Sequence, residues 1–177
     1  MKESFPKENE SVSSELVEEL LRMFDEDQAM RVSGTWDMEL DKRNTARMKE
    51  IIAVSGWPTI SKFGEQAANA AWLLVQHADE DPQFQEKVLA LMKGLHDGEV
   101  SRQDIAFLED RVRVNTGRPI LYGTQFYNDS QGKFGPRPIE DPEKLEEHRA
   151  AMGLDSFEEY EKEMQQVNKK RQEQGLV

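Results

Sequence analysis

Apolar residues recur at helical spacing along most of the chain. The first such stretch runs from Glu15 to Arg31, where apolar side chains three or four residues apart form one face and acidic residues fill much of the other. Further stretches of this kind start near Asp41, Gly64, Asp81, Ser101, Asp141 and Ser156. Several of these residues are suited to cap a helix, so the pattern predicts a mainly α-helical protein.

The stretch from Gly64 to Ala78 differs from the others because it is apolar on nearly all sides. Four alanines occupy five positions between residues 67 and 71, and Trp72 to Val75 are all apolar. A helix without a polar face is a buried one, and small side chains let neighbouring backbones approach closely. We therefore predict that this is the central helix.

Between residues 112 and 139 the apolar period changes from helical spacing to alternation. Val112 and Val114 precede a turn signal at residues 115–117, and a second turn signal covers residues 128–132. This pattern predicts one or two small antiparallel β-hairpins. The prolines at positions 119, 136 and 138 confine the strands to edges or short pieces.

The ends of the chain differ in composition from its middle. We expect residues 1–12 to be a disordered tail, residues 13–160 to be a single globular domain, and residues 161–177 to be the charged end of a C-terminal helix. One stripe of this last helix is apolar and suits contact with the chain's own core or with a second copy, as in a homo-oligomer. The stripe consists of Phe157, Tyr160, Met164 and Val167.

Charge and composition exclude several classes of protein. The net charge is −12 and no basic stripe is present, so we expect no nucleic-acid partner. No apolar run approaches the roughly 20 residues that span a bilayer, and the N-terminus lacks the apolar core of a signal peptide, so we expect no membrane contact and a cytoplasmic location. The chain has no cysteine. No cofactor-binding motif is present, and we predict neither a cofactor nor a metal.

Polar residues occur among the apolar ones on the inward face of the first helix. Projection at 100° per residue places Asp27 and Arg31 inside the apolar arc, with Gln28 at its edge. Asp27 and Arg31 are four residues apart, so their side chains can pair. Burying such groups without a partner costs about 1–3 kcal/mol, so they must satisfy one another or serve a ligand.

The other helices show the same feature. Asn44 lies beneath the apolar face of the second helix, Gln85 lies beside Val88, and Gln76 and His77 occupy the last turn of the central helix. One interpretation is a structural polar network. Because several helices contribute such residues near their ends, the other interpretation is a common pocket at one end of the helical bundle.

His77 is the most reactive of these candidates. It lies at a helix C-terminus, where the helix dipole favours the imidazolium, and Asp79 and Asp81 follow closely. This setting suits a general acid or base, or a metal ligand. Asp81 is better explained as the cap of the next helix, and Asp79 or Glu80 as a solvated turn residue, so this stretch alone leaves the carboxylate partner open.

Four more polar residues lie near the end of the fifth helix and in the hairpin region. Asp110 and Arg111 close the helix, and Tyr122 and Gln125 flank Gly123, which permits a close backbone approach. All four are candidates for the mouth of the pocket. Arg111 is an anion clamp in this interpretation and a cation at a helix C-terminus in the structural one.

Six strings of residues carry a family resemblance. They are Asp27-Gln28-x-x-Arg31, Gly56-Trp57-Pro58, Gln76-His77-Ala78-Asp79, Asp110-Arg111-Val112, Tyr122-Gly123-Thr124-Gln125, and Arg149 followed by Gly153-Leu154. In this order they resemble a bacterial family known only as a domain of unknown function, over about Leu16 to Tyr160. The resemblance implies no activity. Its strings largely coincide with the polar residues that the projection turns inward.

These observations support two main hypotheses. The first is an enzyme for a small-molecule ligand, a hydrolase or another proton-transfer catalyst, in which His77 is the general acid or base and Asp79 or Asp27 assists it. In that enzyme Arg31 or Arg111 holds an anionic group. Polar side chains around them donate hydrogen bonds to the substrate, among them Gln28, Asn44, Gln85 and Gln125.

The second hypothesis is a non-catalytic binding protein, such as an immunity-like protein, whose acidic surface meets a basic partner. A third is a carboxylate–histidine metal site formed by His77, Asp79 and Asp27, which metal analysis of the purified protein would test.

Overall fold

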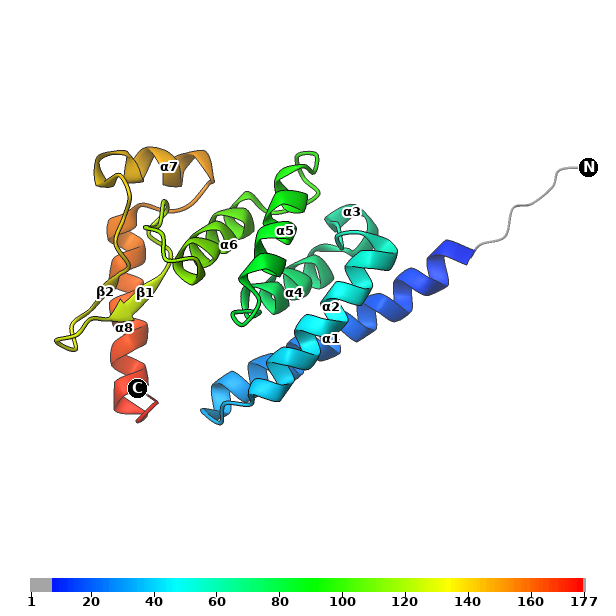
Figure 1. Cartoon of the computed structure of the whole chain (residues 1–177), viewed down its shortest axis with the longest axis horizontal. Helices are drawn as coiled ribbons and strands as arrows, with labels where there is room; N and C mark the ends of the chain where they lie inside the picture. Colours follow the sequence, from blue (N-terminus) through cyan, green and yellow to red (C-terminus); the bar gives the residue numbers. More distant parts are fainter. Residues whose placement is uncertain (1–7, 177) are drawn as a thin grey trace, which may run out of the picture. The chain divides into compact units, whose positions relative to one another are not determined.

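The computed structural model describes the backbone of residues 8–176 and the side chains of residues 14–176. It confirms a mainly helical protein with a small two-stranded antiparallel hairpin (Figure 1). The chain divides into two compact units. Unit 1 contains the described residues up to Ala78 together with Leu95–Val100, and unit 2 contains Asp79–Gly94 and the described residues from Ser101 onward.

Helices α1 (Glu8–Ser33) and α2 (Met38–Ser55) pack against each other in unit 1. Because α1 begins at Glu8, it includes part of the tail expected over residues 1–12, and residues 1–7 of that tail lie outside the described residues. Helix α2 begins earlier than predicted. Its cap is Asp37, whose carboxylate accepts a hydrogen bond from the Glu39 N–H at 3.0 Å. Asp41 instead lies in the first turn of α2.

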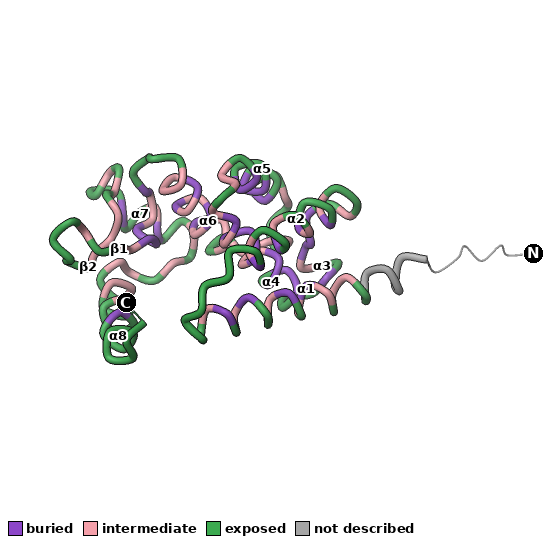
Figure 2. Tube along the Cα trace, turned by 60° about the horizontal axis from the view of Figure 1, so that its bottom comes forward, coloured by how far each residue is buried: buried purple, intermediate pink, exposed green. Residues whose placement is uncertain are grey.

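Helix α4 (Glu65–Gln76) is the centre of unit 1, as its apolar surface predicts. Helices α1, α2 and α3 (Ile60–Phe63) all contact it, and Figure 2 shows its buried positions. Ala70 and Ala71 are at most 1% exposed, so the neighbouring helices approach its backbone closely. The short helix α3 was not predicted. Its first N–H, from Ile60, donates to the Glu99 carbonyl at 3.0 Å within unit 1.

Helices α5 (Pro82–Lys93) and α6 (Arg102–Asn115) pack against each other in unit 2. Both starts are confirmed, because the Asp81 side chain caps α5 and the Ser101 side chain caps α6. The predicted change to a strand at residue 112 is wrong, since α6 continues to Asn115. Val112 lies four residues after Leu108, and both are buried. A spacing of four residues fits one face of a helix and also one face of a strand, so the apolar pattern does not distinguish the two here.

The β-structure is a single hairpin within the described residues. Strands β1 (Phe126–Asn128) and β2 (Phe134–Pro136) are antiparallel, with Phe126 opposite Pro136. A second hairpin around the predicted turn at residues 115–117 is not formed in the described residues, where Ile120 makes an isolated parallel bridge with Ile139. The prolines explain this limited pairing, because each removes one backbone donor from a potential ladder.

The C-terminal part of unit 2 consists of η1 (Pro142–Lys144), α7 (Leu145–Ala151) and α8 (Phe157–Glu173). The predicted apolar stripe on α8 contacts the protein's own chain. The rings of Phe157 and Tyr160 lie 6.3 Å and 5.8 Å from the ring of Phe126, whereas Val167 is 40% exposed. Contact of this helix with a second copy stays a prediction.

Candidate functional site

Asp27 lies at the centre of a polar cluster in unit 1. It is on the inward face of α1, as the helical projection predicts, and its side chain is 1% exposed. Its carboxylate accepts hydrogen bonds from His77 Nδ1 at 3.0 Å, from Arg31 Nη2 at 3.1 Å and from Gln28 Nε2 at 2.8 Å. We call these four residues the Asp27 cluster.

His77 reaches Asp27 from the end of the central helix. It caps the C-terminus of α4, where its backbone N–H donates to the Leu73 carbonyl at 3.1 Å, and its side chain is 17% exposed. Because Asp27 accepts from Nδ1, a neutral imidazole carries its proton on Nδ1 and its lone pair on Nε2. Within the described part of the chain Nε2 makes no hydrogen bond, so this nitrogen is available to a reacting molecule.

Arg31 is engaged by two carboxylates of the chain. Its Nε and Nη2 atoms donate to Asp27, Nη2 also donates to Asp41 at 2.8 Å, and its guanidinium lies 4.6 Å from the centre of the Trp36 ring. A substrate anion would therefore compete with Asp27 and Asp41 for this cation. Its most direct effect in the structure is to hold the Asp27 carboxylate in place.

The environment of Asp27 favours its ionised form. Burial raises the pKa of Asp27, but the hydrogen bonds from His77 and Arg31 outweigh this effect and lower its pKa below the usual value of 3.8. Asp27 is therefore a negatively charged acceptor beside the His77 imidazole.

Two further predicted residues are buried in unit 1. Asn44 is 5% exposed and lies on the face of α2 that also buries Met48 and Ile51. Its Nδ2 atom has no hydrogen-bond partner among the residues that the structure describes. Gln76 is 7% exposed in the last turn of α4. The structure thus confirms that both amides are buried, and a ligand oxygen could satisfy the Asn44 N–H groups.

A second polar cluster lies in unit 2, around Asp79. Arg111 donates to both carboxylate oxygens of Asp79, from Nε at 2.7 Å and from Nη2, and its Nη1 atom donates to Gln125 Oε1 at 3.1 Å. Asn115 Nδ2 donates to Asp79 Oδ1 and to Gln85 Oε1, both at 2.8 Å. We call these five residues the Asp79 cluster.

Asn115 is a member of this cluster that the sequence pattern does not reveal. The change of apolar period at residue 112 predicts a turn at residues 115–117 instead of a helix. Helix α6 includes Asn115, which places it one turn beyond Arg111 on the same face. Burial raises the pKa of Asp79, but the hydrogen bonds from Arg111 and Asn115 lower its pKa by more. Like Arg31, Arg111 is therefore paired with a carboxylate of the chain.

Asp110 holds a loop rather than lying in either cluster. Its side chain is fully buried and accepts hydrogen bonds from the backbone N–H groups of Leu121, Tyr122 and Thr124, at 2.7–3.2 Å, and from the Thr124 hydroxyl at 2.9 Å. Burial raises the pKa of Asp110, and these hydrogen bonds offset part of the increase. The four donors occupy the oxygens that we expected a substrate to contact.

Arg149 holds the same loop through the Tyr122 carbonyl and also contacts the segment between α7 and α8. It is 2% exposed, and its Nη1 and Nε atoms donate to the Tyr122 carbonyl at 2.5 Å and to the Asp155 carbonyl at 2.8 Å. The Tyr122 hydroxyl donates to Glu109 at 3.4 Å. Tyr122 and Gln125 therefore contact two different residues of α6. Tyr122 contacts Glu109, whereas Gln125 contacts Arg111.

Gly123, in the middle of this loop, cannot accept a side chain without strain. Its φ is +66°, and a Cβ atom would lie 2.8 Å from a ring carbon of Phe157. We expect Gly123→Ala to lower the free energy of unfolding by about 2 kcal/mol or more, because the left-handed backbone alone costs roughly 1–2 kcal/mol. Urea unfolding would measure this. Gly132→Ala is the control, since its φ is +79° but its Cβ would meet open space; equal losses in both variants would contradict the clash with Phe157.

The structure brings most of the predicted site residues into these two clusters. His77 and Asp27, which we expected to act together, are in contact, whereas Asp79 pairs with Arg111 in the other unit. The expected pocket shared by all of these residues stays a prediction. Four predicted residues belong to neither cluster: Asn44, Gln76, Asp110 and Tyr122.

Among the described residues, no group of three or more histidine, cysteine or acidic side chains is placed to hold a metal ion. In the same part of the chain, every helix is too short or too polar to cross a membrane. The two polar clusters are therefore the candidate sites that the predicted residues form.

Comparison with known proteins places the chain in a family. Neither the curated proteins nor the solved structures give a significant match. A family model described as a family of unknown function (DUF6624) matches residues 14–170. This range covers both units and both polar clusters. The chain belongs to this family of unknown function, DUF6624.

Proposed function

We propose that the protein is an enzyme acting on a small molecule, in which His77 transfers a proton and Asp27 orients and stabilises it. The observation that carries the proposal is the 3.0 Å hydrogen bond from His77 Nδ1 to Asp27, which leaves Nε2 unbonded within the described residues. A buried carboxylate behind a histidine fixes the imidazole tautomer and stabilises the imidazolium that forms during proton transfer.

The reaction class that suits this pair is hydrolysis or another proton transfer. In hydrolysis, Nε2 accepts a proton from water as the water oxygen attacks the substrate, and the imidazolium then returns the proton to the leaving group. The Nδ1 proton stays on His77, beside the ionised Asp27. Gln28 and Arg31 contact Asp27, so they are positioning residues.

Burial supports a functional interpretation of the cluster. Asp27 is fully buried, and Arg31 and His77 are each 17% exposed. Apolar residues in these positions would pack α1 against α4 without the desolvation cost of charged groups. Asn44 adds a buried N–H group with no partner among the described residues. We therefore include Asn44 as a hydrogen-bond donor to the substrate.

The test is the loss of activity on replacing His77. We expect His77→Gln to lower kcat/KM by about 100-fold or more, because glutamine can donate to Asp27 but cannot accept the proton. Purified wild-type protein is first assayed with a panel of ester, lactone and amide substrates, and any substrate turned over is then compared between variants. His96→Gln is the control, since His96 is exposed. Near-normal turnover by a folded His77→Gln variant would remove His77 from the mechanism.

A second measurement does not depend on knowing the substrate. Proton–nitrogen NMR correlations of the imidazole distinguish its two neutral tautomers. We expect the neutral His77 ring to carry its proton on Nδ1 in the wild type, and to lose this preference in Asp27→Asn, whose amide offers only one acceptor oxygen. A wild-type ring protonated on Nε2 would contradict the proposed role of Nε2 as the base.

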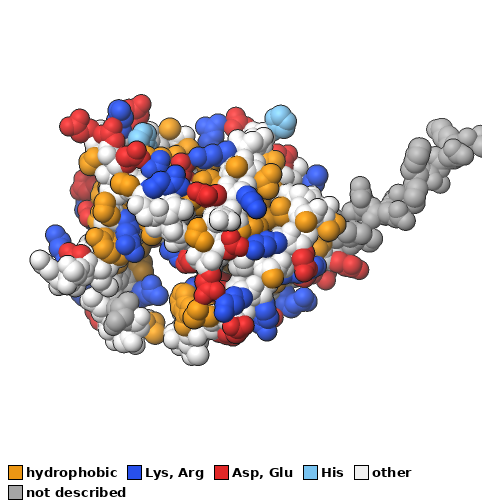
Figure 3. Space-filling model, viewed as in Figure 1, with side chains coloured by type: hydrophobic (Ala, Val, Ile, Leu, Met, Phe, Trp, Pro, Cys, Tyr) orange, Lys and Arg blue, Asp and Glu red, His pale blue; other side chains and the backbone are white. Residues whose placement is uncertain are grey.

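The alternative is a non-catalytic binding protein in which the same cluster only fixes the packing of α1 against α4. Its net charge of −12 favours a basic partner. On the face shown in Figure 3, acidic and basic side chains are interspersed, so no single acidic patch dominates that face. Candidate partners are titrated at low and high salt, because a charge-driven contact weakens as salt rises. In this alternative, His77→Gln leaves the affinity for the partner unchanged.

A further inference from the structure

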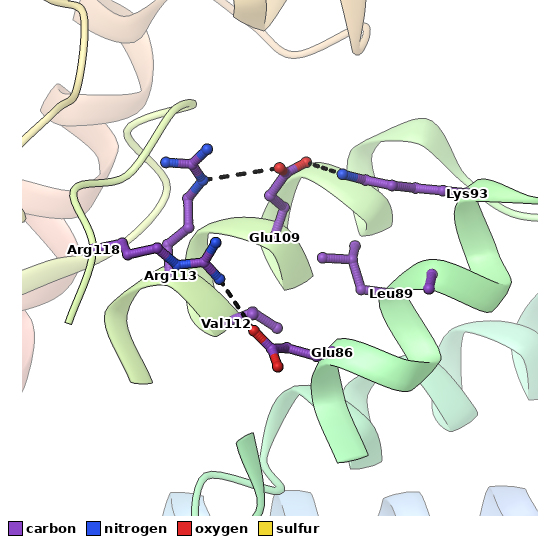
Figure 4. A pocket seen from close by; sticks show the side chains of 8 residues that line it. Glu86, Leu89, Lys93, Glu109, Val112, Arg113 and Arg118 are labelled. Atoms are coloured by element: carbon purple, nitrogen blue, oxygen red, sulfur yellow. Dashed lines mark hydrogen bonds and ion pairs between the residues drawn. The ribbon is translucent and has the colours of Figure 1, made fainter. Parts of the chain in front are cut away.

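A pocket of about 270 Å³ lies between α5 and α6 in unit 2 (Figure 4). None of the residues that line it belongs to the Asp27 or the Asp79 cluster. Its apolar surface comes from Leu89 and Ala90 of α5 and from Val112 of α6, and its cations are Lys93, Arg113 and Arg118. The pocket thus combines an apolar floor with several cationic side chains.

The apolar floor is formed by side chains fixed in the core of unit 2. Leu89 is 9% and Val112 is 1% exposed, and both lie where α5 packs against α6. Ala90 contributes only a methyl group, which leaves the space above it open. A ligand with a compact apolar body can lie against this surface and remove it from water.

The polar walls offer more donors than acceptors. Arg113 donates from Nη1 to the Pro119 carbonyl and to Glu140, but its buried Nε makes no hydrogen bond within the described residues. A carboxylate oxygen of Glu109 lies 3.8 Å from that Nε, too far for a hydrogen bond. Figure 4 shows Arg113 and Arg118 at the same end of the pocket, across from Leu89. A ligand oxygen between the two arginines would accept the hydrogen bond that Glu109 does not.

The charged side chains at the pocket nearly balance. Lys93, Arg113 and Arg118 face two lining carboxylates, Glu86 and Glu109, which leaves a net charge of +1 on the lining. Glu140, outside the lining, pairs with Arg113 and offsets that charge, so a ligand anion binds by replacing one of these carboxylates. This local balance contrasts with the net charge of −12 for the whole chain.

The ion pairs at the rim can be exchanged for a ligand. Lys93 and Glu109 are 2.7 Å apart, and Arg118 and Glu86 are 3.3 Å apart. Both cations are nearly half exposed, at 46% and 49%. Exposed pairs of this kind contribute about 0–1 kcal/mol, so replacing Glu86 beside Arg118 with a ligand carboxylate costs little.

We propose that this pocket binds a small organic monocarboxylate. The carboxylate lies between Arg113 and Arg118, where the planar guanidinium groups can each donate to its two oxygens. The apolar body of the ligand lies over Leu89, Ala90 and Val112. This site is separate from the proposed proton-transfer site at His77, and neither proposal depends on the other.

Binding is tested with benzoate as the probe and the full-length protein. Benzoate is titrated while backbone amide NMR signals are recorded, with benzyl alcohol as a neutral analogue and inorganic phosphate as an anion without an apolar body. We expect benzoate to shift signals of α5, α6 and residue 118 saturably, and to bind at least about tenfold more tightly than either control compound.

Two variants and one matched control localise the site. Arg118→Gln removes a half-exposed cation and should weaken benzoate binding about tenfold without weakening the contact with benzyl alcohol. Ala90→Leu places a larger side chain in the pocket on an exposed helix position, so it should abolish benzoate binding while the fold is retained. Lys87→Gln is the control, because Lys87 is an exposed cation of α5 that does not line the pocket.

Several results would each overturn the proposal. Four of them are no saturable shifts up to about 10 mM benzoate, equal binding of benzoate and benzyl alcohol, binding of phosphate as tight as that of benzoate, and undiminished binding by Ala90→Leu. An equal loss of affinity in Lys87→Gln and Arg118→Gln would also overturn it, because it would show an effect of net charge rather than a site.

Discussion

Replacing Asp27 with alanine should lower the free energy of unfolding by about 3–5 kcal/mol. The substitution removes the shared acceptor of His77, Arg31 and Gln28, and it leaves the guanidinium of Arg31 in a largely buried position with only Asp41 as a carboxylate partner. Removing one member of a buried charged network costs much more than the network contributes, because the remaining charge stays desolvated. Urea unfolding followed by circular dichroism measures the loss.

Asp25→Ala is the matched control, because Asp25 is an exposed carboxylate on the same helix. We expect it to change the free energy of unfolding by less than about 0.5 kcal/mol. Comparable losses in Asp25→Ala and Asp27→Ala would show that the effect comes from the net charge of α1, and would contradict the structural role of the Asp27 cluster.

The dependence on pH gives this prediction a definite sign. The folded-state pKa of Asp27 is lowered below 3.8, so its contribution to stability is fully present above the unfolded-state value and is lost as the pH falls through the folded-state value. The difference between wild type and Asp27→Ala should therefore shrink as the pH falls from about 5 to below about 4. A difference that grows over this range would contradict the lowered pKa.

The helical projection predicted the inward positions of the site residues well, for a physical reason. A residue's face on a regular helix follows from its sequence position alone, so Asp27, Asn44 and Gln85 could be placed among buried residues without any tertiary information. The structure confirms all three as at most 5% exposed. The central position of α4 followed from the same principle, because a helix that lacks a polar face can be stable only when it is surrounded.

Partners between elements could not be predicted in this way. The projection shows that Asp27 and Arg31 can pair, but it cannot show that His77, fifty residues later, donates to Asp27, or that Asp41 is the second carboxylate on Arg31. The enzyme hypothesis also gives Arg31 or Arg111 a substrate anion to hold. Arg31 pairs with Asp41 and Arg111 pairs with Asp79, and the projection could not show these partners because they depend on how the elements meet.

Boundaries of elements were the other source of error, and they affected the site. Asp41 and Asp37 are both suitable caps, and the chain uses Asp37, which frees Asp41 to pair with Arg31. At the end of α6, the β-branched Val112 and Val114 favoured a strand, but burial of Val112 beside Leu108 overrides this local preference. The additional helical turn is what brings Asn115 to Asp79.

Asp110→Ala should produce the second large effect, in unit 2, with a loss of about 3 kcal/mol or more in the free energy of unfolding. The backbone N–H groups of Leu121, Tyr122 and Thr124 all donate to this carboxylate, and within the described residues they have no other acceptor. Each buried N–H left without a partner costs about 1–3 kcal/mol, although water entering the space left by the carboxylate offsets part of this cost.

Asp129→Ala is the matched control for this prediction, because it removes the same kind of bond at the surface. The Asp129 carboxylate accepts from the backbone N–H groups of Gln131 and Lys133 at 2.8 Å and 2.9 Å in the hairpin turn. Water can replace those bonds, so we expect a loss below about 1 kcal/mol.

Amide hydrogen exchange supplies a second measurement of the Asp110 prediction. Asp110→Ala should speed exchange at the backbone N–H groups of Leu121, Tyr122 and Thr124. Unchanged exchange there would contradict the loop-holding role of Asp110 and return its carboxylate to the candidates for substrate binding.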